Sequence, residues 1–393
     1  MTLNPSQLKG LLVVHLILIS LNLSACDFTQ VDEKNHLGPL LEQCPQLEPQ
    51  QIISRECLIP HLPSLLIIDS RAQLIPRWWR DGQELKSPVV SQVEWQVFNA
   101  EHLLVDTLVS DQLELSDLSM SSSLEPIYIK LHLTLSEEQR GGCPQEFEVQ
   151  RAYLLTQTQD QKFSEELSDR FPSLPPSYFD RWVDEVVEFE IGERTSPQFA
   201  SASSVLGPPS FEEKGNALQG DLFDQTTSLG AGGKITVRFD SPLVNSLGDD
   251  LGVYENSFNG RFLELAQVGV SSDGLHFAYF DVLSIRTDPV GSFEEVDPLA
   301  YWGLAGNTPA GLGVGFDLAN LVDHPLSRVG LLDLSQIRYI QIQDIIGDGS
   351  YLDASDRAIF DPTPTRISAG FDLDAIGGVT SENRRCQPLD HPQ

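Results

Sequence analysis

Short runs of alternating hydrophobic and polar residues, separated by turn residues, restrict most strongly how this chain can fold. The clearest run is IYIKLHLTL, in which Ile127, Ile129 and Leu131 share one face while Lys130 and His132 share the other. A period of two residues is the period of a β-strand. Between residues 178 and 385 no run of ten or more residues has a convincing helical period. The sequence therefore predicts an all-β fold.

The predicted strands fall into two groups that differ in composition. The first group spaces its strands with polar turns and places Trp95 in a middle strand, which predicts a small β-sandwich. The second group is rich in glycine and in Asp-Gly and Asn-Gly turns, such as SSDG at Ser271–Gly274, which predicts an antiparallel sandwich of jelly-roll type. The predicted parts after the N-terminal segment are a first domain at 57–157, a linker at 158–177, a second domain at 178–385 and a tail at 386–393.

Two family resemblances accompany these groups. The first group resembles the immunoglobulin-like and PKD-like domains of bacterial surface proteins, which often place a Gly-Cys pair, here Gly142-Cys143, before the last strand. In the second group seven blocks occur in order: DEVVEFEIG, SSVLGPP, SLGAGGKITVRFD, DDLGVYENSFNGRFLELAQVGVSSDG, YWGLAGNTPAGLGVGFDLANL, IRYIQIQDI and GFDLDAIGG. These blocks resemble a family of bacterial cell-surface proteins that often carry a PEP-CTERM-type sorting tail. The resemblance implies an extracellular sandwich similar to galactose-binding-like modules, and implies no reaction.

The N-terminal segment predicts export. Residues 1–25 place an apolar run after Lys9, which is typical of a signal peptide. The run ends in Leu23-Ser24-Ala25-Cys26, which resembles the lipobox of bacterial lipoproteins. That resemblance implies cleavage before Cys26 and its modification with acyl chains such as palmitate, which together give a stable membrane anchor. We expect an exported chain anchored at the cell surface or in the periplasm, with residues 26–56 as a tether. The alternative is an ordinary signal peptide with a chance cysteine.

The remaining cysteines and the charge restrict the partners. Cys44, Cys57, Cys143 and Cys386 are an even number in an exported chain, which predicts two disulfides and leaves three pairings open. The chain has 57 acidic and 25 basic residues, a net charge of −32. Such a charge repels nucleic acid. Its partners are therefore expected to be the membrane, through the lipid anchor, and a glycan or another envelope protein.

Acidic residues inside the family blocks suggest a structural calcium ion. In GFDLDAI the alternation places Asp372 and Asp374 on one face, where two carboxylates repel each other unless they are solvated or bridged by a cation. Calcium prefers hard oxygen ligands from strand ends and loops. The candidate ligands are Asp250, Glu255, Asp317, Asp372 and Asp374. The alternative is that these acids cap turns and are solvated on the outer face.

Aromatic residues supply the candidate ligand-binding side chains. Tyr254, Tyr301 and Trp302 are candidates for stacking on a sugar, although core packing explains them equally well. The chain contains no G-x-S-x-G or H-E-x-x-H motif, so we expect a protein that is not an enzyme. The favoured function is a non-catalytic binding module, with carbohydrate as the first ligand class. A structural or adhesive protein that binds another protein is the alternative, and a hydrolase with two acids facing across a cleft is the third.

Overall fold

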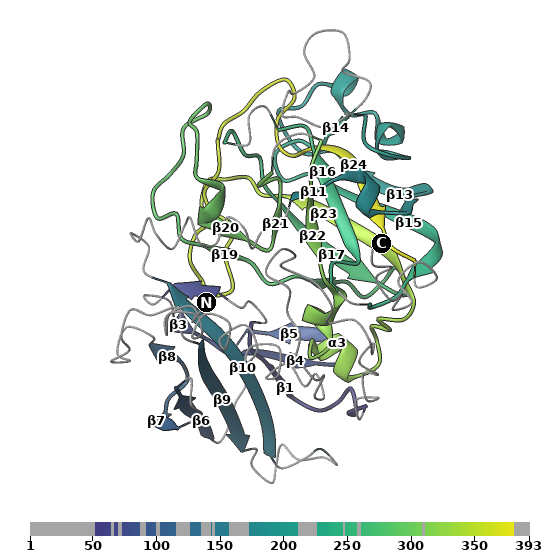
Figure 1. Ribbon diagram of the computed structural model, residues 1–393. Coiled ribbons are helices and arrows are strands. Elements are labelled where there is room, and N and C mark those ends of the chain that lie inside the picture. Colours follow the sequence, from purple (N-terminus) through teal and green to yellow (C-terminus); the bar gives the residue numbers. More distant parts are fainter. Residues whose placement is uncertain are drawn as a thin grey trace, which may run out of the picture. The chain divides into compact units, whose positions relative to one another are not determined.

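The structure is a computed structural model with two compact units (Figure 1). The residues that it describes are 52–63, 67–69, 73–86, 92–99, 103–114, 126–134, 143, 146–156, 173–210, 226–246, 248–257, 261–308 and 311–380. The first unit contains the described residues up to 156 except Pro63, and the second contains Pro63 and residues 173–380. Cys26, Cys44 and Cys386, with the predicted signal peptide, lie outside the described residues. Among those residues no helix is long and apolar enough to span a membrane.

The first unit is built from three sheets. The largest has the strand order β2-β10-β9-β6-β7, and all its pairs are antiparallel except β2 with β10. Its strands are β2 (Ile67–Asp69), β6 (Gln92–Phe98), β7 (Leu104–Val109), β9 (Pro126–Thr134) and β10 (Glu146–Thr156). The other two sheets contain β1 (Ile59–His61), β4 (Arg77–Arg80) and β5 (Gln83–Leu85), and β3 (Gln73–Leu74) with β8 (Leu113–Glu114).

The predicted alternation places the core of the first unit. Ile127, Ile129 and Leu131 of β9 are fully buried, while Lys130 and His132 are partly exposed. Trp95 of the neighbouring β6 is also fully buried, and its indole Nε1 donates to the Ser110 carbonyl at 2.8 Å. Such a hydrogen bond is what allows an indole to be buried in an apolar core. The expectation of a tryptophan in the core of this unit is confirmed.

The structure contains a disulfide bond between Cys57 and Cys143. This bond occurs in one of the three possible pairings of the four cysteines. The two residues are separated by 86 positions, and both are buried. The bond therefore closes a ring that includes most strands of the first unit.

The second unit has two larger sheets, both antiparallel. One has the order β11-β22-β16-β24-β12, with β14 also paired to β24, and the other has the order β13-β15-β23-β17-β18, with β21 also paired to β17. The strands of the first of these sheets are β11 (Ser173–Leu174), β12 (Arg181–Trp182), β14 (Thr227–Ser228), β16 (Leu251–Glu255), β22 (Gly313–Phe316) and β24 (Asp372–Gly378). Those of the second are β13 (Glu185–Glu190), β15 (Lys234–Leu243), β17 (Ala266–Ser271), β18 (Ala278–Tyr279), β21 (Leu304–Ala305) and β23 (Ile337–Asp344).

Among the described residues of the second unit, helical structure is confined to single turns. They are α3 (Pro325–Arg328) and the 3-10 turns η3 (Pro176–Tyr178), η4 (Pro197–Phe199), η5 (Ala202–Val205), η6 (Pro298–Ala300) and η7 (Leu318–Leu321). A further pair of short strands, β19 (Leu283–Ser284) and β20 (Tyr301–Trp302), completes the unit. The prediction of a β-rich chain with antiparallel sheets and almost no helix is therefore confirmed.

Two further segments whose apolar residues predict a single strand each, FLELAQVGVSS and HFAYFDVLS, form shorter strands in the structure. FLELAQVGVSS pairs as a strand only from Ala266, because the Leu265 N–H is donated to the Asp361 carboxylate at 3.0 Å rather than to a neighbouring strand. HFAYFDVLS contains only the two-residue strands β18 and β19. Alternation records which side chains are buried, and buried side chains also occur on irregular segments that are held by side-chain hydrogen bonds.

The disulfide gives a prediction for the stability of the first unit. A bond that closes a loop of this length removes conformational freedom from the unfolded chain, an effect on the order of 4 kcal/mol. We expect the double variant Cys57→Ser/Cys143→Ser to unfold with a free energy lower by about 2–5 kcal/mol, measured by urea denaturation and circular dichroism. An unchanged urea midpoint would show that this bond does not stabilise the unit.

Candidate functional site

Six buried acidic residues of the second unit interact with one another electrostatically. Four of them belong to strands of the two large sheets and two lie outside the strands, and none of the six residues is more than 6% exposed. We call this set the buried acidic cluster: Glu255, Glu264, Asp344, Asp361, Asp372 and Asp374. Burying a carboxylate is costly unless the charge is paired, hydrogen-bonded or removed by protonation.

The register of the two sheets explains why these residues approach one another. In the first sheet Glu255 ends β16, and its backbone partner Leu373 lies between the two aspartates of β24. In the second sheet Asp344 ends β23 opposite Ala266, and Glu264 lies two positions before Ala266. Antiparallel pairing therefore places Glu255, Asp372 and Asp374 at one end of the first sheet. It places Asp344, with the nearby Glu264, at one end of the second.

The Asp344 carboxylate connects the two sheets. One oxygen, Oδ1, accepts the Phe371 N–H at 2.7 Å, and the other, Oδ2, accepts the Gly232 N–H at 2.7 Å. Gly370 precedes Phe371 with a φ of 73°, and a Cβ there would lie 2.7 Å from Asp344 Oδ1. Only glycine combines that backbone angle with that close approach. This contact accounts for the glycine of the GFDLDAI block.

The other acids differ in how completely they are hydrogen-bonded. Asp361 Oδ2 accepts from the Leu265 N–H at 3.0 Å, and Asp374 accepts from the Ser210 N–H through both oxygens, at 3.0 and 3.2 Å. Asp372 accepts from the Ser228 hydroxyl. By contrast, Glu255 Oε2 and Glu264 Oε1 are buried and have no hydrogen-bond partner among the described residues. These two oxygens are the unsatisfied part of the cluster.

Burial and mutual repulsion raise the pKa values of these carboxyl groups. Burial is the largest cause for each of them, and it raises the pKa of Asp344 and Asp372 to about 7 and that of Asp374 to about 6. The pKa of Glu255 lies well above its usual value because of burial and then the charges of Asp372, Asp374 and Asp361. Burial and neighbouring acids also raise the pKa values of Glu264 and Asp361 well above their usual values. The cluster therefore holds protons in the neutral range.

The five predicted metal ligands occupy two different places. Glu255, Asp372 and Asp374 belong to the buried acidic cluster. Asp250 and Asp317 instead cap η7, where Asp250 Oδ2 accepts the Leu318 N–H at 3.1 Å and Asp317 Oδ1 accepts the Ala319 N–H at 2.8 Å. Within the part of the chain that the structure describes, no group of three or more His, Cys, Asp or Glu residues is arranged to hold a metal ion. A calcium ion shared by all five residues does not fit this arrangement, and bound calcium stays a prediction.

Glu264 and Asp361 were not among the predicted ligands. Glu264 stands between two leucines and Asp361 between Phe360 and Pro362, so each is a single acid inside an apolar stretch. That context is the sequence signal that could have identified both, because an acid among residues that must be buried is itself buried. The expectation that such acids are solvated on an outer face is wrong for Asp372 and Asp374, because both faces of β24 are buried.

The candidate stacking residues lie in the interior. Tyr254 is fully buried, its ring lies 6.1 Å from that of Phe179, and its hydroxyl donates to the Leu174 carbonyl at 3.2 Å. Tyr301 is also fully buried and donates to the Phe360 carbonyl at 2.6 Å, and Trp302 is 4% exposed. Core packing, the alternative reading for these three residues, describes their surroundings.

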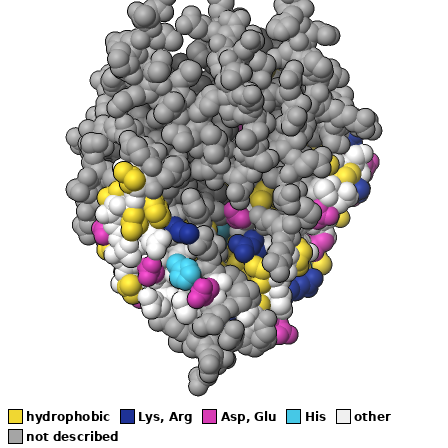
Figure 2. Space-filling view, turned by 60° about the horizontal axis from the view of Figure 1, so that its bottom comes forward, with side chains coloured by type: hydrophobic (Ala, Val, Ile, Leu, Met, Phe, Trp, Pro, Cys, Tyr) yellow, Lys and Arg dark blue, Asp and Glu magenta, His cyan; other side chains and the backbone are white. Residues whose placement is uncertain are grey.

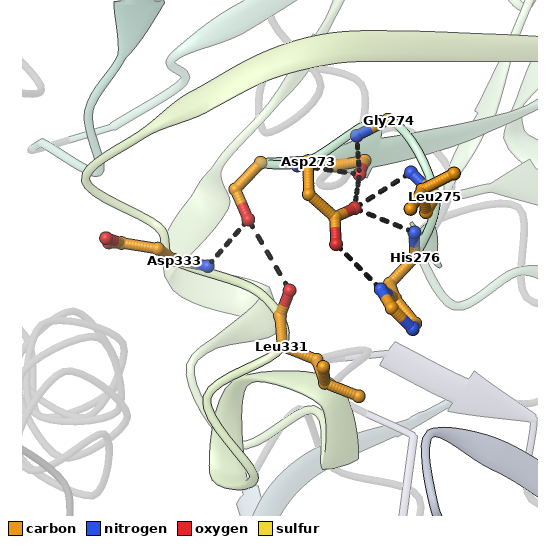
Figure 3. Close-up of polar contacts among 8 residues, drawn as sticks. Asp273, Gly274, Leu275, His276, Leu331 and Asp333 are labelled. Carbon is orange, nitrogen blue, oxygen red and sulfur yellow. Dashed lines mark hydrogen bonds and ion pairs between the residues drawn. The ribbon is translucent and has the colours of Figure 1, made fainter.

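In the second unit, a histidine contacts a carboxylate at the SSDG turn (Figure 3). Asp273 Oδ1 accepts the N–H groups of Leu275 and His276 at 2.8 and 2.9 Å, and Asp273 Oδ2 lies 2.7 Å from His276 Nδ1. Partial burial alone would raise the Asp273 pKa, but the hydrogen bonds from His276 and Leu275 outweigh it and lower the pKa to about 2. Among the described contacts no serine hydroxyl meets the imidazole, so this pair stabilises a turn.

Comparisons with known proteins add no identification. The chain matches no protein-family model, and the search of curated proteins finds no similar sequence.

The raised pKa values of the buried acidic cluster predict how stability depends on pH. A carboxyl group whose pKa is raised in the folded state binds its proton more tightly there than in the unfolded chain. The resulting stabilisation is complete below about pH 4 and is lost as the pH rises through the folded values of about 6 and 7. We expect the free energy of unfolding of the second unit to fall by several kcal/mol between pH 4 and pH 8 in the presence of a chelator, measured by urea denaturation.

Asp372→Asn is the informative variant for this prediction. It removes a titrating group whose charge also raises the pKa values of Glu255, Glu264 and Asp344, so the pH profile should become flatter. Asp288→Asn removes an exposed acid instead and should keep the profile of the unchanged chain. If both variants kept the same slope, the cluster would not be the origin of the pH dependence. Adding Ca²⁺ at pH 8 tests the calcium prediction in the same assay, because a bound cation would raise the denaturation midpoint.

Proposed function

We propose that this chain is an exported lipoprotein, held at a bacterial membrane by acyl chains on Cys26. The lipobox-like sequence Leu23-Ser24-Ala25-Cys26 supports the anchor, and the Cys57–Cys143 bond supports an oxidising compartment outside the cytoplasm. The two units would be displayed on the tether at 26–56. In this proposal the first is a sandwich of the immunoglobulin or PKD type and the second is a jelly roll of the galactose-binding-like type. The antiparallel sheets of the two units support both assignments.

The second unit is, in this proposal, a non-catalytic module that binds carbohydrate. The observation that carries the proposal is an open pocket of about 460 Å³ lined by Arg194, Pro364 and Arg366. Pockets that bind small ligands have volumes of about 300–1,000 Å³. The described lining contains guanidinium groups and no carboxyl group, whereas glycoside hydrolysis needs a pair of carboxyl groups across the bond that is cleaved. The acids with raised pKa values are buried elsewhere, in the buried acidic cluster. This arrangement supports binding over hydrolysis.

A protein partner is the second candidate function, and one feature of the first unit favours it. β7 is an outer strand in the order of its sheet, and its residues Leu104, Val105 and Val109, with the adjacent Leu103, are 45–66% exposed. Figure 2 brings the lower part of Figure 1 forward and shows hydrophobic side chains at the surface among charged ones. An outer strand with exposed apolar side chains can pair with a strand of another chain.

The anchor is tested with Cys26→Ser. We expect the unchanged chain to fractionate with membranes and to incorporate labelled palmitate, while the variant does neither, because the modification requires the thiol of this cysteine. Cys44→Ser is the control, and it should keep both properties. If Cys26→Ser still incorporated the label, the anchor would not be on this residue.

The binding function is tested with a panel of neutral and acidic glycans. We expect the full-length chain in detergent to bind at least one member and to release no reducing sugar from any of them. A panel without binding, together with capture of a specific envelope protein that is lost on Val105→Asp, would favour the protein-binding alternative. Release of reducing sugar would contradict the non-catalytic assignment.

A further inference from the structure

The described lining of the pocket carries two positive charges in a chain with many acidic residues. Among the ion pairs that the structure describes, four other arginines meet an acid: Arg77 with Glu84, Arg238 with Glu185 and Asp240, Arg286 with Glu294, and Arg357 with Asp353. Arg194 and Arg366 are exposed, and neither forms an ion pair with a described residue. In a chain of net charge −32, two guanidinium groups at one pocket concentrate positive charge there.

The backbone that positions these arginines is held from two distant parts of the chain. The Ile367 N–H donates to the Arg194 carbonyl at 3.0 Å, and the Ser196 N–H donates to the Ile367 carbonyl at 2.8 Å. The Thr195 hydroxyl also donates to the Ile367 carbonyl, at 3.3 Å. These bonds fix the residue after Arg366 against the residues at Arg194, so the two arginines belong to one hydrogen-bonded junction.

Two residues of this junction adopt left-handed backbone angles without being glycine. Arg194 has a φ of 64°, and Ile367 has a φ of 79°. A β-branched residue in this region is a genuine outlier and costs on the order of 1–3 kcal/mol. The Ile367 side chain is 60% exposed, so burial of this side chain does not offset that cost. Strain of this kind accumulates where a backbone must present a ligand-binding group.

Asp348 is an acid whose charge interacts with that of Arg194. Its pKa is lowered first by hydrogen bonds from Ser350, and the Arg194 charge makes a smaller contribution. Asp348 itself is not part of the described lining of the pocket. The Arg194 guanidinium therefore remains available to a ligand.

We propose that this pocket binds the oxyanion group of an acidic sugar, a carboxylate or a sulfate carried by a polysaccharide. A guanidinium presents a planar set of N–H donors that matches the oxygens of a carboxylate or sulfate, and two of them can hold one anionic group from two sides. The exposed ring of Pro364 supplies apolar surface beside the charged groups. This inference rests on the proposed carbohydrate-binding function and names the ligand class of that pocket.

The test compares three polymers on the full-length chain in detergent. Polygalacturonate carries carboxylates, dextran sulfate carries sulfates, and dextran is neutral. We expect calorimetry to detect binding of at least one acidic polymer, with an affinity that falls as NaCl is added. The acidic polymer that binds more tightly shows whether the pocket prefers a carboxylate or a sulfate. Nonspecific binding of either polymer is disfavoured by the negative charge of the chain.

Substitutions assign the binding to the pocket. Arg194→Gln/Arg366→Gln should weaken the affinity for the acidic polymer about tenfold or more, because two charge-assisted contacts are lost. Arg181→Gln, in β12, removes a positive charge that does not line the pocket and should leave the affinity unchanged. An unchanged melting temperature shows that the double variant is folded. The expected loss of affinity is then due to the lost contacts between the two arginines and the polymer.

Three outcomes overturn the inference, and they can be told apart. If the double variant binds the acidic polymer as tightly as the unchanged chain, the anion is bound elsewhere. If the unchanged chain binds a neutral glycan of the panel but neither acidic polymer, carbohydrate binding stands and the acidic ligand is wrong. If no glycan binds at all, the proposed function fails together with the inference.

Discussion

The two hydrogen bonds accepted by the Asp344 carboxylate are the contact on which the arrangement of the second unit depends. One oxygen holds the backbone immediately before β24 and the other holds the Gly230–Gly233 turn before β15, while Asp344 itself ends β23. A single side chain therefore fixes segments that belong to both large sheets. Neither donor N–H is in a regular ladder, and that of Phe371 is buried, so without this carboxylate the Phe371 N–H would lose its partner at a cost of about 1–3 kcal/mol.

In the buried acidic cluster, the carboxylates hold backbone segments through hydrogen bonds, but their burial removes the solvation of their charge. Carboxylates are useful at strand ends because each can accept more than one backbone N–H group, as Asp344 does from Phe371 and Gly232. Gathering several of them in one buried region raises their pKa values, and two oxygens, on Glu255 and Glu264, are left without a described partner. The arrangement therefore favours protonated carboxyl groups in a protein whose overall charge is strongly negative.

The sequence predicts the β-rich class and several of the long strands because alternation records burial directly. Residues 127–134 of IYIKLHLTL and 337–344 of IRYIQIQDI are strands as expected, and Trp95 lies in the core. The position of the acids could be predicted only in part. Glu255, Asp372 and Asp374 are brought together by a register that depends on partners far along the chain.

The features that the sequence does not predict depend on the backbone angles of single residues or on whether a side chain is exposed. Asp317 repeats the GFDL motif of Asp372 but caps a 3-10 turn, because the chain leaves β22 directly after Phe316. No pattern of residue types marks Arg194 and Ile367 as left-handed. The same limit applies to Tyr254, since an aromatic residue in an alternating run fits a core and a binding face equally well.

The Cys57–Cys143 bond has a consequence for the integrity of the polypeptide after proteolysis. Because 86 positions separate the two cysteines, most loops of the first unit lie inside one covalent ring. A protease that cuts one of those loops would open the ring without separating the chain into two pieces. The second unit would remain covalently joined to the N-terminal segment after such a cut. It would be separated from that segment only if the bond were also reduced or the chain were cut outside the ring.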